Sequence, residues 1–117
     1  MTIVMLTTDL LIASQASAAA TAQGAVFSHV ASAAALLQQV QQQAVDLIAI
    51  DLATCDADLA EWVPRLRNAD AATVRIVAFG PHVHPARLAA ARQAGCDEVF
   101  SRGQFHAGMH QLFAAEV

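Results

Sequence analysis

The residue with the clearest potential for chemistry is Asp51, a carboxylate that directly follows an apolar run. The run is Leu47-Ile48-Ala49-Ile50, and small or polar residues come after Asp51. An apolar run of this kind predicts a buried β-strand, so the carboxylate is expected where the strand ends. There it can serve as a nucleophile, as a structural partner for a positive side chain, or as a solvated acid.

Four of the five histidines form two close pairs. His106 and His110 are four residues apart and share one face of a predicted helix, while His82 and His84 lie in a predicted loop. No Asp, Glu or Cys is placed by the sequence to complete a set of metal ligands. We therefore predict ordinary surface histidines and no metal site.

The two cysteines and the tryptophan are predicted to have structural rather than functional roles. Cys55 follows one predicted strand and Cys96 precedes another, which places them at opposite edges of the sheet, too far apart for a disulfide. Trp62 shares helical spacing with apolar neighbours. It is predicted to pack in the core rather than to face a partner.

Strand-like and helix-like segments alternate along the chain. Short apolar runs predict strands at residues 3–6, 25–29, 46–50, 74–79 and 97–101. Helix-forming segments predict helices at residues 9–22, 32–43, 58–68, 85–93 and 104–116. Pro64 lies inside the third of these helices and predicts a bend or a late start there.

This alternation predicts an α/β fold. Five strands and five helices in turn are typical of a doubly wound five-stranded parallel sheet with helices on both faces. A length of 117 residues fits one domain, residues 1–117. In such sheets ligands gather at the carboxyl edge of the strands, which is where Asp51 is expected.

Composition excludes several classes of function. Six arginines, no lysine and ten acids give a formal charge of −4 and no basic stripe, so binding to nucleic acid is not expected. The N-terminal segment has no basic region, and Asp9 interrupts its apolar part, which disfavours an export signal. No run approaches the roughly 20 apolar residues of a membrane span. The expected location is the cytoplasm.

The chain resembles the receiver domain of bacterial response regulators over its whole length. The most specific parts are DLIAIDL, with Asp51 at the phosphoacceptor position, and AARQAGCDEVFSR near the end of the chain. The resemblance implies a flavodoxin-like fold with strand order 2-1-3-4-5. It also implies a signalling module rather than an enzyme, located in two-component signal transduction.

Several functional positions differ from the pattern of that family. Receivers carry an acidic pair after the first strand, which holds Mg²⁺ together with the phosphoacceptor; here Thr7 and Thr8 stand there, followed by Asp9. Asp9 either substitutes as a ligand or acts as an acid at a helix N-terminus. The Ser or Thr that ends the fourth strand is replaced by Gly80, and the lysine that ends the fifth by Arg102.

These departures leave three uses for Asp51: a phosphoacceptor with unusual metal ligation, a carboxylate that locks one conformation, or a solvated acid. We favour the locking role and predict that Arg102 reaches across the carboxyl edge to pair with Asp51. The predicted function is an atypical receiver that binds proteins without phosphorylation and needs no cofactor. The alternatives are a working receiver that takes a phosphoryl group from a histidine kinase on Asp51 with Mg²⁺, and a small-molecule binder at the carboxyl edge.

The resemblance also implies where a partner binds. Receivers use their fourth helix, fifth strand and fifth helix for dimers and for output partners. The predicted helix at residues 85–93, which carries Arg87 and Arg92, is thus the expected start of a partner surface, and a homodimer is one form that such a contact takes.

Overall fold

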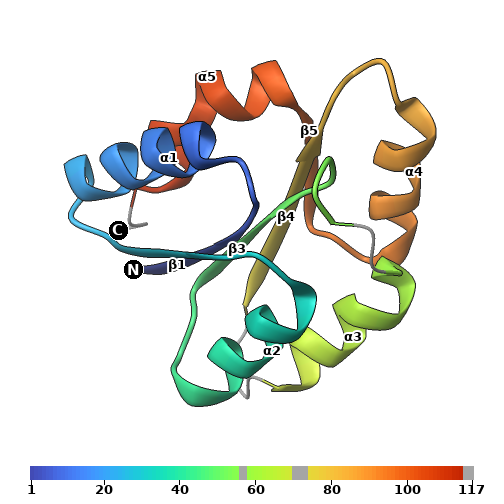
Figure 1. Ribbon diagram of the computed structural model, residues 1–117, viewed down its shortest axis with the longest axis horizontal. Coiled ribbons are helices and arrows are strands. Elements are labelled where there is room, and N and C mark those ends of the chain that lie inside the picture. Colours follow the sequence, from blue (N-terminus) through green and yellow to red (C-terminus); the bar gives the residue numbers. More distant parts are fainter. Residues whose placement is uncertain (56–57, 70–73, 115–117) are drawn as a thin grey trace.

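A parallel sheet of five strands lies between two layers of helices (Figure 1). The computed structural model describes residues 1–55, 58–69 and 74–114. The strands are β1 (Thr2–Leu6), β2 (Val26–Val30), β3 (Leu47–Asp51), β4 (Arg75–Gly80) and β5 (Glu98–Ser101). The helices are α1 (Leu10–Ala22), α2 (Ala33–Gln42), α3 (Leu59–Ala69), α4 (Pro85–Ala94) and α5 (Arg102–Leu112).

The strand order is β2-β1-β3-β4-β5, and every neighbouring pair is parallel. The predicted doubly wound sheet and its order are therefore confirmed. β3 lies in the middle and is buried along its whole length, which agrees with its apolar run Leu47–Ile50 before Asp51. Because all strands run the same way, the ends of β1, β3 and β4 meet at one edge of the sheet.

Local capping explains where the helices begin. Asp9 caps α1, and Ser32 caps α2 with its hydroxyl. Ser101 accepts a hydrogen bond from the Gln104 N–H, and the Gln104 side chain accepts one from the Ser101 N–H. This reciprocal cap starts α5 at Arg102, two residues before the predicted start.

The third helix contains its proline without a late start. α3 begins at Leu59, directly after the predicted cap Asp58, and continues past Pro64 to Ala69. Of the two outcomes predicted from Pro64, a bend or a late start, the late start does not occur.

Alternation along the central strands divides the core into two clusters. On one face, Ile48 and Ile50 pack with side chains from α2, α3 and α4. On the other, Leu47 and Ala49 pack with α1 and α5, where the rings of Phe79 and Phe105 stack 4.0 Å apart between centroids. None of the helices in the described part of the chain is long and apolar enough to span a bilayer.

Trp62 does not belong to either core cluster. Val63 and Leu66 are the buried residues of α3, and Trp62 is only half-buried beside them. The guanidinium of Arg65 lies 4.4 Å from the centroid of the Trp62 ring. The prediction that Trp62 packs in the core is wrong, because α3 turns Val63 and Leu66 toward the sheet instead.

Candidate functional site

The register of the sheet places Thr7 beside Asp51. Leu6 of β1 lies opposite Ile50 of β3, so the next residues along, Thr7 and Asp51, stand side by side on the same face of the sheet. Both are buried, with 1% of Thr7 and 0% of Asp51 exposed. These are the only buried polar or charged residues in the described part of the chain, which makes their contacts important for the whole edge.

Both oxygens of the Asp51 carboxylate accept hydrogen bonds. The Thr7 hydroxyl donates to Oδ2 at 2.8 Å, and the Ala53 N–H donates to Oδ1 at 3.0 Å. Thr7 Oγ1 also accepts a bond from the Asp9 N–H at 3.0 Å. No described arginine or histidine forms an ion pair with Asp51. Uncharged donors therefore satisfy this buried carboxylate.

Arg102 pairs with Asp9, not with Asp51. Its Nη2 contacts Asp9 Oδ2, while Asp9 Oδ1 accepts from the N–H groups of Leu11 and Ile12 at the start of α1. The bond from Arg102, and after it the bond from the Ile12 N–H, holds the pKa of Asp9 below its ordinary value.

The predicted pair between Arg102 and Asp51 is therefore wrong. Arg102 is the first residue of α5 rather than the last of β5, and Asp9 at the start of α1 takes its guanidinium. The interpretation of Asp9 as an acid at a helix N-terminus agrees with its capping bonds.

Gly80, at the end of β4, faces the side chain of Leu52. A Cβ added to Gly80 would lie 3.2 Å from Leu52 Cβ and 3.6 Å from Leu88 Cδ2. Leu52 is buried and is held by its own N–H, which donates to the Phe79 carbonyl at 2.9 Å. A side chain at position 80 would therefore crowd Leu52, which would have to shift by a few tenths of an ångström.

This set of residues is a poor match for a resident magnesium ion. Magnesium needs near-octahedral oxygen ligation and is usually held by carboxylates. Here Asp51 already has protein donors on both oxygens, and the Asp9 carboxylate is engaged by Arg102 and the α1 backbone. Thr8 is exposed and brings no charge.

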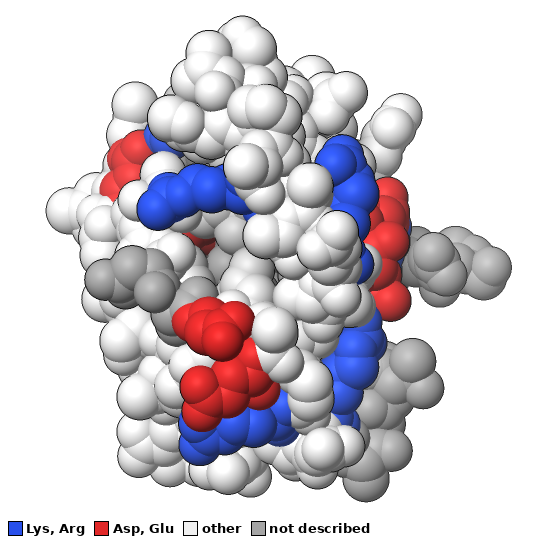
Figure 2. Space-filling view, turned by 90° about the vertical axis from the view of Figure 1, so that its right-hand side faces the viewer, with Lys and Arg blue, Asp and Glu red and all other residues white. Residues whose placement is uncertain are grey.

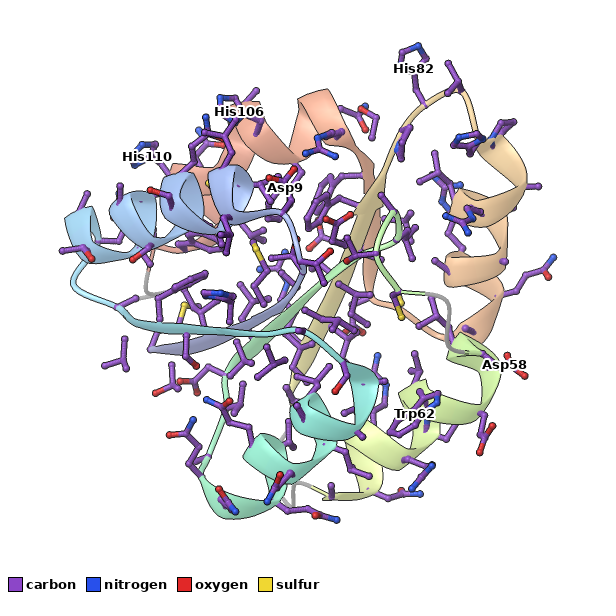
Figure 3. The ribbon with its side chains drawn as sticks, in the orientation of Figure 1. Asp9, Asp58, Trp62, His82, His106 and His110 are labelled. Atoms are coloured by element: carbon purple, nitrogen blue, oxygen red, sulfur yellow. The ribbon has the colours of Figure 1, made fainter. Side chains whose placement is uncertain are left out.

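The histidines do not gather at this edge. In Figure 3, His106 and His110 point outward from α5, while His82 lies at the far end of the loop before α4. Within the described residues, no group of three or more His, Cys, Asp or Glu side chains is arranged to hold a metal ion.

The cysteines lie where the prediction places them along the strands. Cys55 follows the carboxyl end of β3 and Cys96 precedes the amino end of β5. Both pack against the core cluster under α2, α3 and α4, and Cys55 also lines a cleft with Gln93 and Ala94 near the end of α4. Burial raises the pKa of the Cys96 thiol to about 11.

Comparison with solved structures identifies the architecture. The receiver domain of the TMAO respiratory system response regulator TorR superposes with a TM-score of 0.78 at 22% identity, covering 95% of this chain and 94% of that one. The receiver domain of the sensor histidine kinase PA1611 from Pseudomonas aeruginosa, which has magnesium in its active-site cleft, superposes at 0.78 and 17% identity, covering 96% and 93%. The chain has the receiver-domain fold.

A third receiver, the beryllofluoride-activated NtrC4 receiver domain dimer, superposes with a TM-score of 0.73 at 11% identity and covers 97% of this chain and 98% of that one. No protein-family model matches the chain, and no curated protein does. The likeness to receivers predicted from the sequence motifs is confirmed at the level of the fold.

Leu52 is a residue of this receiver-fold edge that the sequence analysis missed, and Arg87 was named only as part of a partner surface. Arg87 Nη1 donates to the Leu52 carbonyl at 2.9 Å and so ties α4 to the loop after Asp51. The signal that could have found Leu52 was a large apolar residue directly after the aspartate, combined with a glycine at the end of the next strand.

Proposed function

We propose that the chain is a signalling module of receiver fold that binds a protein partner and does not depend on phosphorylation of Asp51. The observation that carries this proposal is the closed hydrogen bonding of Asp51. An attacking carboxylate oxygen would first have to give up the bond from Thr7 or from Ala53. The developing charge would then have no cation in contact to offset it.

Two neighbours add support to the proposal. Leu52 fills the space beside Gly80, and Arg102 is engaged with Asp9. In a receiver that works by phosphoryl transfer, the side chains at these positions contact the phosphoryl group. Here each is already in contact with another part of the protein, which favours one fixed conformation of the carboxyl edge.

The proposed partner surface comprises α4, β5 and α5. β5 is an edge strand of the sheet, and α4 exposes small side chains, Ala86, Ala89 and Ala90, that allow a partner to approach closely. Val83, in the loop before α4, is 66% exposed. The NtrC4 receiver forms a dimer in solution, and we propose that this chain also uses its surface for protein contacts, with a second copy as one possible partner.

Phosphorylation is tested by intact mass after incubation with acetyl phosphate and Mg²⁺. We expect no stable mass gain and no amide NMR shifts with beryllofluoride. Asp51→Asn is the control. A phosphoryl mass gain on the wild-type chain that is absent in Asp51→Asn would favour the working receiver and reject our proposal.

The partner surface is tested with a matched pair of charge insertions. Ala89→Arg places a long cation on α4, and Ala18→Arg places the same side chain on the exposed face of α1. Ala89→Arg should reduce self-association measured by light scattering and the amount of partner captured. Ala18→Arg should leave both unchanged. An equal response to both variants would place the partner surface elsewhere.

A further inference from the structure

A cleft lies between α4 and two described segments, residues 52–55 after β3 and residues 58–60 at the start of α3. Its volume is about 550 Å³, larger than two other surface clefts of about 360 and 270 Å³. This volume falls in the range of small-molecule sites in proteins. Figure 2 views this side of the molecule, where acidic and basic groups lie around a hollow in a largely uncharged surface.

The cleft has an apolar floor and one positive charge. Leu52 and Leu59 come from the loop and α3, and Ala90 and Ala94 come from α4. Arg87, one turn before Ala90, also lines the cleft and is exposed. A ligand with an apolar chain and an anionic head group could therefore pack its chain against these side chains while its head group contacts Arg87.

Arg87 has donors to spare for such a head. Its Nη1 donates to the Leu52 carbonyl, and this is the only acceptor that it contacts among the described residues. A guanidinium carries five N–H donors in a planar fork that matches a carboxylate. The bond to Leu52 holds the side chain beside the cleft, which lowers the entropy that a ligand must remove.

The acid that lines the cleft, Asp58, lies on the opposite side from Arg87. Asp58 lies at the start of α3, and its Oδ1 accepts from the Ala60 N–H at 3.0 Å. In Figure 3 its side chain points outward from α3. The cap engages one oxygen and leaves the negative charge, so Asp58 and Arg87 place opposite charges on the α3 and α4 sides of the cleft, and an anionic head is expected at Arg87.

We propose that this cleft binds a small amphiphilic carboxylate, with the carboxylate on Arg87 and the hydrocarbon body over Leu52, Leu59, Ala90 and Ala94. This goes beyond the proposed function and does not depend on it, since it concerns neither Asp51 nor phosphorylation. Because α4 forms one wall, a bound ligand lies directly behind the proposed partner surface.

The test is an amide NMR titration with decanoate, in the absence of Mg²⁺ and phosphate donors, with decanol as the uncharged probe. We expect saturable shifts that centre on residues lining the cleft. Arg87→Gln should weaken decanoate binding at least about tenfold, because a charge-assisted hydrogen bond is lost. Decanol should bind the wild type and Arg87→Gln equally.

Two further variants complete the design. Arg92→Gln removes an exposed charge of α4 that does not line the cleft, and it should bind decanoate like the wild type. Ala90→Phe fills the cleft but keeps Arg87, and it should abolish the shifts while the folded spectrum persists. Shifts that do not saturate, that spread over the surface, or that weaken equally in Arg87→Gln and Arg92→Gln would overturn the proposal.

Discussion

Replacing Thr7 by valine tests whether its hydroxyl holds the buried Asp51 in place. The change keeps the shape of the side chain and removes the donor that lies 2.8 Å from Asp51 Oδ2. A hydrogen bond to a charged group contributes about 1.5–3 kcal/mol, and an acceptor left unsatisfied in the interior costs more. The Asp9 N–H loses its acceptor as well. We expect the free energy of unfolding to fall by about 2–4 kcal/mol.

For a chain of 117 residues, this loss corresponds to a fall in Tm of about 8–16 °C. Urea unfolding and thermal unfolding followed by circular dichroism measure both quantities. Thr8→Val is the matched control, because Thr8 is exposed and its substitution should change stability by less than about 0.5 kcal/mol.

A double-mutant cycle with Asp51→Ala isolates the contact. If the bond from the hydroxyl to the carboxylate carries the effect, Thr7→Val should lower stability by no more than about 1 kcal/mol once the carboxylate is gone. The reasoning fails if Thr7→Val is as stable as Thr8→Val. It also fails if the loss is the same with and without Asp51, since the hydroxyl would then act through another group.

Three further predictions follow from neighbouring contacts. Gly80→Ala should lower stability by about 1–3 kcal/mol because its Cβ would lie 3.2 Å from Leu52 Cβ, and the penalty should persist in Leu52→Ala, which keeps that Cβ; urea unfolding that shows no penalty in either background would contradict the contact. Because the folded state holds the pKa of Asp9 below its ordinary 3.8, its contribution to stability is present above that pH and is lost as the pH falls through the lower folded value. Arg102→Ala should therefore lose less stability than the wild type on acidification below pH 3.8, measured as the free energy of unfolding against pH. If the two profiles run parallel, the ion pair between Arg102 and Asp9 does not stabilise the fold. Cys96, with its pKa raised from 9.0 to about 11, should react with iodoacetamide about 100-fold more slowly at pH 8 in the folded chain than in urea; equal rates by peptide mass spectrometry would show that burial does not protect it.

The fold could be predicted because the signals for it are local. Apolar runs mark the strands, and caps such as Asp9 and Ser32 mark helix starts within a residue or two. The position of Asp51 at the carboxyl edge followed directly from the end of its apolar run. Its neighbour Thr7 was named from the resemblance to receivers, as a position after the first strand, and the register of the sheet brings it beside Asp51.

The contacts at the site could not be predicted in the same way. Whether Arg102 reaches Asp9 or Asp51 depends on a single turn of helix, and the reciprocal cap at Ser101 decides it by making Arg102 the first residue of α5. Contact between Leu52 and Gly80 depends on how two strand ends lie in space. These are properties of tertiary packing, which a linear pattern does not contain.

The contact between Leu52 and Gly80 also constrains how this sequence can change over evolutionary time. A side chain at position 80 brings its Cβ to 3.2 Å from Leu52 Cβ, a carbon that every residue except glycine carries. We infer that such a substitution is accommodated by a small movement of the backbone after β3 and not by a prior change at position 52. Comparing the folding of Gly80→Ser in the wild-type and Leu52→Ala backgrounds would show this, since the cost should be similar in both.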